Sequence, residues 1–186
     1  MQASWLKRAP ARLARPAVVP RFASYRQTCG NAPPQRRLGT DTAAMTLLDR
    51  PIRTLADLTA AWRFIDGNHG YDAPQVFALM IDRNAHLMPA VVHVYDSETD
   101  EGLDEVAMRN LIWAHGEIIR THDPGASLAL MRARPGGADL TSEDRAWCCM
   151  VHRLLVQAPF ATKPLFFATD RSVGVVPPDA LVDAIG

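Results

Sequence analysis

Residues 128–147 read LALMRARPGGADLTSEDRAW, and this stretch decides the fold class. The apolar run predicts a buried strand over 127–133, and the Gly- and Pro-containing segment 134–140 predicts a turn. Thr141 or Ser142 then caps a helix. Apolar residues at helical spacing face inward in that helix: Trp147, Val151, Leu154 and Leu155. A strand, a turn and a packed helix in direct succession predict an α/β domain.

The rest of the chain predicts a similar mixture of strands and helices. Residue patterns indicate, in chain order, a helix over 53–66, strands over 75–82 and 86–96, a helix over 103–121, a strand over 163–170 and a short strand within 171–181. The two strands before the long helix form an antiparallel hairpin, in which Pro89 indicates an edge position or a bulge. The order α-β-β-α-β-α-β-β predicts an α/β fold with a mixed sheet flanked by about three helices.

The predicted helix over 103–121 has a broad apolar face. One stripe at helical spacing consists of Leu103, Ala107, Leu111, Ala114 and Ile118, and a second stripe, Met108, Ile112, His115 and Ile119, widens it. We expect this face to pack on the sheet, because the apolar stripe of a helix must be buried against another element.

Composition and charge exclude several classes of protein. The chain has 186 residues, enough for one domain with a proper core, and its 20 basic and 20 acidic residues cancel. A basic field over the whole protein, which would attract nucleic acid, is therefore absent. The three cysteines, Cys29, Cys148 and Cys149, do not suit a disulfide framework. Because the chain shows neither a membrane-spanning apolar run nor a secretory signal, we expect a cytoplasmic protein without a membrane partner.

The first 44 residues differ in composition from the remainder. Residues 1–40 contain eight Lys or Arg and no acidic residue, whereas residues 41–186 hold 12 basic and 20 acidic residues, a net charge of −8. The segment 1–44 is rich in Arg, Pro and Ala and lacks periodicity, so we expect it to be disordered. Three interpretations stay open: an upstream region translated in error before Met45, an organelle transit peptide, or a basic arm. We expect residues 45–186 to form a single domain, and the Ala/Arg/Pro/Gly bias suggests a bacterial source.

Four segments, in this order, resemble the JAB/MPN fold and in particular its bacterial RadC-like branch. They are VFALMIDRNAHLM (76–88), DEVAMRNLIWAHGE (104–117), LALMRARPGGADLTSEDRAW (128–147) and PLFFATDRSVGVV (164–176), within a span of about Pro74 to Leu181. They are similar to the opening hairpin, the long helix, the metal loop and the closing strands of that family. The resemblance implies zinc-dependent hydrolysis of an amide or isopeptide bond, with two His and one Asp on the zinc and a Glu as general base.

The chain departs from this pattern at each catalytic position. The two zinc-binding histidines of the family fall on Arg132 and Arg134, which stay protonated and cannot bind zinc. The positions of the family's Ser, Asp and base Glu fall on Ser142, on Arg145 and near Gln75. We therefore expect no catalytic residue, no metal and no cofactor, and we interpret the chain as a non-catalytic interaction or scaffold module. A zinc hydrolase with a rearranged site and a nucleic-acid-associated protein are the alternatives.

The same loop offers a candidate anion site. Arg132 and Arg134 alternate along the strand end, so both point to one face, beside a Gly-rich turn and a helix N-terminus. Together with Ser142 and Arg145 they could bind a carboxylate or phosphate. Three nearby acidic residues, Asp139, Glu143 and Asp144, favour instead a solvated cluster in which the charges neutralise one another. The expected partner is an unknown protein or an anionic ligand, and the acidic core disfavours nucleic acid.

Three other candidate sites have weaker patterns. The six histidines show no metal-binding spacing. Cys148 or Cys149 could form a nucleophile pair with His152, but cysteine on an apolar helix face is more often part of the core. The acidic segment 97–105 lacks the ligand spacing of a calcium loop. We therefore interpret all three groups as structural.

Overall fold

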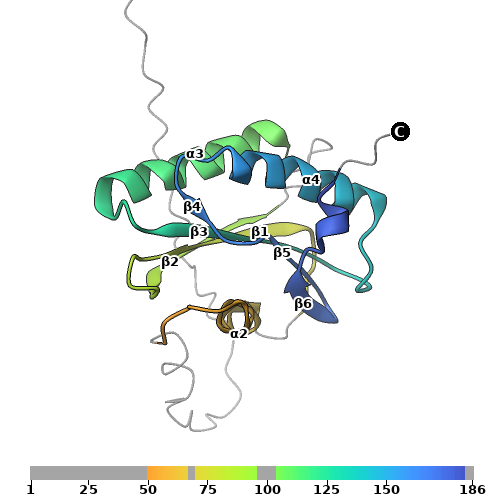
Figure 1. The fold of residues 1–186 in the computed structure, drawn as a ribbon. Helices are drawn as coiled ribbons and strands as arrows, with labels where there is room; N and C mark the ends of the chain where they lie inside the picture. The colour runs from red at the N-terminus through yellow and green to blue at the C-terminus, as the bar shows by residue number, and fades with distance from the viewer. Residues whose placement is uncertain (1–49, 67–69, 96–103, 183–186) are drawn as a thin grey trace, which may run out of the picture. The chain divides into compact units, whose positions relative to one another are not determined.

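A computed structural model describes residues 50–66, 70–95 and 104–182. Within them the chain forms α2 (Leu55–Asp66), β1 (Gln75–Ile81), β2 (Leu87–Tyr95), α3 (Glu105–His122), β3 (Ser127–Arg134), α4 (Ser142–Val156), β4 (Ala161–Thr162), β5 (Phe166–Thr169), β6 (Ser172–Val175) and the 3-10 helix η1 (Pro178–Ala180). The described part is an α/β structure with a mixed sheet and three α-helices, as the sequence predicts, and the sheet has six strands where five were predicted (Figure 1). The predicted segment 1–44 and most of the acidic segment 97–105 lie outside the described residues.

The strands lie in the order β2-β1-β3-β5-β6, and β4 pairs with β3 away from this path. β1 is antiparallel to both β2 and β3, β3 runs parallel to β5, and β5 is antiparallel to β6. The predicted hairpin is confirmed, and Pro89 lies both on an edge strand and within the register shift that interrupts the pairing of β1 with β2. The strand predicted over 163–170 is confirmed as the shorter β5, and the prediction omitted β4.

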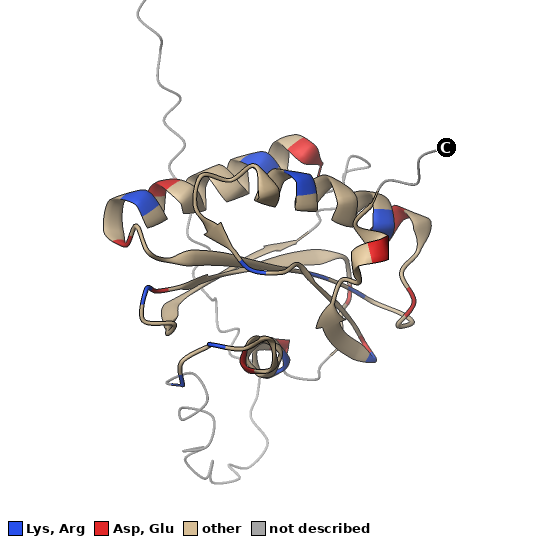
Figure 2. Cartoon of the chain, in the orientation of Figure 1, with Lys and Arg blue, Asp and Glu red and all other residues tan. Residues whose placement is uncertain are grey.

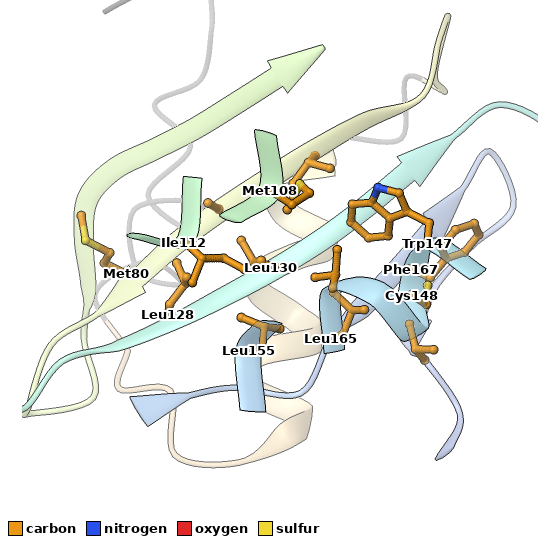
Figure 3. Close-up of a cluster of buried hydrophobic side chains, with 14 of the residues drawn as sticks. Met80, Met108, Ile112, Leu128, Leu130, Trp147, Cys148, Leu155, Leu165 and Phe167 are labelled. Carbon is orange, nitrogen blue, oxygen red and sulfur yellow. The ribbon is translucent and has the colours of Figure 1, made fainter. Parts of the chain in front are cut away.

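Helices cover both faces of the sheet, with α3 and α4 on one face and α2 on the other (Figure 1). This arrangement explains why β1 is buried throughout and β3 is buried except for Arg134, since a strand covered on both faces does not alternate between buried and exposed residues. Alternate side chains of β1 enter different cores: Val76, Ala78 and Met80 join α3 and α4, whereas Phe77, Leu79 and Ile81 join α2. Figure 3 shows Met108 and Ile112 of α3 near Leu128 and Leu130 of β3 in the first core.

The face of α3 that packs on the sheet differs from the prediction. The second of the two predicted stripes is buried: Met108, Ile112, His115 and Ile119. Of the first stripe, Leu111 is partly buried, whereas Ala107, Ala114 and Ile118 are exposed, and Leu103 lies outside the described residues. Asp104 begins the helix, because its carboxylate accepts a hydrogen bond from Ala107 N at 2.7 Å. The described residues contain no helix long and apolar enough to span a membrane.

Candidate functional site

The candidate anion site lies where β3 ends and α4 begins. Arg132 and Arg134 both approach Asp144, with Nε of Arg134 2.8 Å from Oδ2 and Nε of Arg132 3.8 Å from Oδ1. The two arginines therefore project to the same face of the sheet, as their alternation along the strand predicts. The carboxylate is 1% exposed, so the charges meet in a buried position and not in solvent. The expectation that these charges neutralise one another is confirmed for Asp144, whereas the expectation that the cluster is solvated was wrong. We call Arg132, Arg134 and Asp144 the ionic cluster.

Asp144 is held by the start of α4. Thr141 is the N-cap residue, and its hydroxyl accepts a hydrogen bond from Asp144 N at 3.1 Å. In return, Oδ2 of Asp144 accepts from Thr141 N at 2.9 Å and from the Thr141 hydroxyl at 2.8 Å. This reciprocal pair is a capping box. One carboxylate thus caps the helix and balances two guanidinium groups.

Each of the three guanidinium nitrogens of Arg134 donates a hydrogen bond within the protein. In addition to its bond with Asp144, Nη1 donates to the Pro135 carbonyl and Nη2 to the Asp139 carbonyl, both at 2.8 Å. Its cationic carbon lies 5.4 Å from the centroid of the Phe167 ring, a favourable cation–π arrangement. The contact with Asp139 involves the backbone carbonyl and not the expected carboxylate. Arg134 therefore fixes the loop between β3 and α4 and leaves few donors for an added anion.

Arg132 is more deeply buried, at 5% exposure. Its guanidinium carbon lies 4.7 Å over the Trp147 ring, and Nη2 is 4.0 Å from Oε1 of Glu143. Its Nε has no hydrogen-bond acceptor among the described residues, although it is within ionic distance of Asp144. A buried guanidinium needs its counter-charge, because an isolated charge in this position would be strongly destabilising.

The other two predicted anion ligands do not join this cluster. Ser142 is the first residue of α4 and is exposed. Arg145 turns away, and its Nη1 lies 3.9 Å from Oδ2 of Asp179 in an exposed contact. Counting along the loop had placed Arg145 at the position of the family's aspartate, whereas the residue that faces β3 is Asp144. One helical residue changes the direction of a side chain by about 100°, which accounts for the difference.

Asp170 is a residue of this region that the sequence analysis missed as a functional candidate. It lies in the turn between β5 and β6 and accepts hydrogen bonds from Gly136 N at 2.7 Å and Tyr71 N at 2.9 Å. These backbone bonds hold the pKa of the Asp170 carboxyl below its usual range. Gly136 has a φ of 104°, which favours glycine at this bend. Asp170 therefore fixes the far side of the loop that Arg134 fixes from within.

The cysteines and histidines form no site in the described residues, where no three His, Cys, Asp or Glu side chains are grouped for metal binding. Burial raises the pKa of the Cys148 thiol to about 12, so it is not a thiolate at neutral pH. Cys149 is buried and its thiol contacts the Ala180 carbonyl at 3.3 Å. His115 is buried and donates from Nδ1 to the Leu111 carbonyl at 2.8 Å. Burial lowers the pKa of His115, so it is neutral at pH 7.

A groove of about 590 Å³ lies between α3 and the C-terminal end of α4. Ile112, Trp113, Gly116, Leu154 and Phe160 supply apolar walls, and Arg109, Glu117 and Arg120 lie along its rim. Phe160 packs directly on Gly116, where an added Cβ would be 2.5 Å from Cε1 of the ring. This groove shares no residue with the ionic cluster.

No protein-family model, no curated protein and no solved structure matches the chain. The function therefore has to be argued from the residues themselves. The ionic cluster is neutralised from within and supported by hydrogen bonds, which is the chemistry of a structural link. The groove and the helix face beside it carry exposed apolar and charged side chains, among them Trp113.

Proposed function

We propose that the chain is a RadC-like JAB/MPN-fold protein that binds no zinc and acts as a non-catalytic interaction module. The observation that carries the proposal is the ionic cluster. Arg132 and Arg134 occupy the positions that the resemblance gives to two zinc-binding histidines, and both face Asp144, Arg132 in a buried and Arg134 in a partly buried position. Zinc requires neutral imidazole, thiolate or carboxylate ligands, and two protonated guanidinium groups would repel it.

The ionic cluster also engages Asp144, the carboxylate one residue before Arg145, which is the position that the resemblance gives to the family's zinc-binding aspartate. Oδ2 of Asp144 already accepts from Arg134 and from both the N–H and the hydroxyl of Thr141. A zinc ion would have to displace these bonds and leave the buried Arg132 and the partly buried Arg134 without their counter-charge. The ionic cluster therefore joins β3 to α4. In a zinc-binding relative, the metal would make that connection.

The first test is the zinc content of the full chain, purified without a metal-binding tag, incubated with zinc and dialysed. We expect far less than one zinc per chain by elemental analysis, and a melting temperature that a chelator does not change. Near one zinc per chain would contradict the proposal and favour the alternative, a zinc hydrolase with rearranged ligands.

A gain-of-binding variant tests the resemblance itself. Arg132→His combined with Arg134→His would present two imidazoles beside Asp144, which is the His₂-carboxylate set of a zinc site. We expect this double variant to bind close to one zinc per chain, and the matched variant R132Q/R134Q to bind none. Adding D144A to the histidine variant should remove the zinc. If the histidine variant binds no zinc while remaining folded, the correspondence with the family's metal loop is wrong.

A further inference from the structure

The outer face of α3 carries large apolar side chains that the fold does not use. Trp113 is 67% exposed and Val106 is 63% exposed. They are seven residues apart, or about two helical turns, and therefore share one side of the helix. Trp113 also lines the groove between α3 and α4. Exposed tryptophan beside an apolar groove is a common anchor of protein interfaces.

Charged residues lie on both sides of Trp113 in a defined order. Glu105 and Arg109 come before it, and Glu117 and Arg120 come after it, at spacings of three or four residues that place them on the same face. Each pair is joined within the helix: Arg109 contacts Glu105, and Nη2 of Arg120 lies 2.5 Å from Oε2 of Glu117. Figure 2 shows charged positions of both signs along the outer helix surfaces. The face therefore reads negative, positive, Trp, negative, positive.

We propose that this face binds the same face of a second copy of the chain, with the two α3 helices antiparallel and a two-fold axis at Trp113. Such an axis pairs positions equally far from Trp113 on its two sides. Arg109 precedes it by four residues and meets Glu117 of the second copy, which follows by four. Glu105 precedes Trp113 by eight residues and Arg120 follows it by seven, so these two lie across the axis within one residue of direct opposition, about 1.5 Å along the helix. Arg109 then lies directly opposite a charge of the other sign, and Glu105 lies close to one.

This charge order distinguishes a second copy in one orientation from other arrangements. A parallel pair in register would place each charge against its equal, which is unfavourable. A two-fold axis lets one surface patch bind itself, so a single self-complementary helix face is sufficient for a closed dimer. The two tryptophans meet at the centre, where each can enter the groove of the other copy beside Gly116 and Phe160. The inference uses no residue of the ionic cluster and is therefore independent of the zinc experiment.

The contact is small. From Glu105 to Arg120 the face is about 23 Å long at roughly 1.5 Å per residue. Interfaces at the low end of the size range bind weakly, so we expect a dimer whose population rises with concentration. Sedimentation of the full chain should show a shift from the 20.5 kDa monomer toward twice that mass as concentration increases. A monomer at all concentrations would overturn the proposal.

Single substitutions locate the contact. Trp113→Ser should raise the dimer dissociation constant at least about tenfold, because it removes the central anchor. Arg109→Glu and Glu117→Arg should each do so by roughly tenfold, because each places two like-charged pairs across the axis. Arg63→Glu on α2, on the opposite face of the sheet, is the control and should leave the dimer unchanged. If the wild type dimerises but none of the three α3 substitutions weakens the dimer, the dimer forms through another surface and the proposal is refuted.

Mixing two variants tests the antiparallel register. In a pair formed by one R109E chain and one E117R chain, all contacts across the axis again have opposite signs. We therefore expect the two variants to remain monomeric alone and to form a heterodimer when mixed. If Arg109 and Glu117 acted only through their ion pairs within α3, mixing would not restore dimerisation, because each variant still lacks its own intrahelical pair. Two monomeric variants that do not associate on mixing would overturn the proposed register.

Discussion

Removal of the Asp144 carboxylate should be among the most destabilising single changes in the described part of the chain. Asp144→Ala leaves the buried Arg132 and the partly buried Arg134 without their counter-charge, and breaking a buried ion pair in this way costs about 3–5 kcal/mol. It also removes the carboxylate half of the capping box with Thr141, whose loss we set at about 1 kcal/mol. We therefore expect a decrease of about 4–6 kcal/mol in the free energy of unfolding. That is a large part of the roughly 5–15 kcal/mol that stabilises a typical domain.

The measurement is urea unfolding of the full chain, followed by tryptophan fluorescence, with the free energy taken from linear extrapolation. Asp139→Ala is the matched control, because the Asp139 side chain is exposed and only its backbone carbonyl contacts Arg134. We expect this control to change stability by no more than about 0.5 kcal/mol.

A second variant separates charge from packing. In R132M/R134M/D144A the whole ionic cluster is replaced by uncharged side chains, so no buried charge is left unpaired. We expect it to be more stable than D144A alone, because the desolvation cost of the two cations disappears with them. A loss below about 1 kcal/mol for D144A, or a triple variant less stable than D144A, would refute this account of the ionic cluster.

Two further predictions concern α3. Gly116→Ala should lower the free energy of unfolding by about 1–3 kcal/mol, because its Cβ would overlap the Phe160 ring. Alanine usually stabilises a helix relative to glycine, so in a Phe160→Ala background the same substitution should raise the free energy of unfolding measured in urea. Because burial lowers the pKa of His115 in the folded chain, the unfolded chain binds more protons as the pH falls below about 6.5, and stability decreases there. His115→Leu should lose less stability than the wild type between about pH 7 and pH 5 in urea titrations, and parallel losses would contradict this assignment.

Local patterns predicted the elements that depend mainly on neighbouring residues. The apolar run before Arg132 became β3, and Thr141, one of the two predicted caps, begins α4. Pro89 indicated an edge strand or a bulge, and both are present. These predictions succeed because strand burial, helix capping and the missing proline N–H act over a few residues.

The buried face of α3 could not be predicted in the same way. Leu111 and Ile118 belong to one apolar stripe and Ile112 and Ile119 to the other, and both stripes have helical spacing. Which stripe is buried depends on how α3 meets the sheet and α4, which is a tertiary contact. His115 lies on the buried stripe and donates a hydrogen bond to the Leu111 carbonyl. The buried stripe therefore contains a polar residue, which the residue pattern alone would not favour for the core. The exposed face is then the one that carries Trp113, which we propose to be the binding surface.

Prediction of the candidate site depended on a difference of one residue, between Asp144 and Arg145. Residue counting against the resembling family pointed to Arg145, whereas the capping box directs Asp144 toward Arg132 and Arg134. The signal was present in the sequence, because Thr141 and Asp144 have the three-residue spacing of a capping box. Once Thr141 is taken as the cap, the third residue of the helix must turn back toward the loop, and that residue is an aspartate. The choice of cap therefore decides whether the end of β3 meets a third arginine, which would favour an anion, or a carboxylate that neutralises it from within.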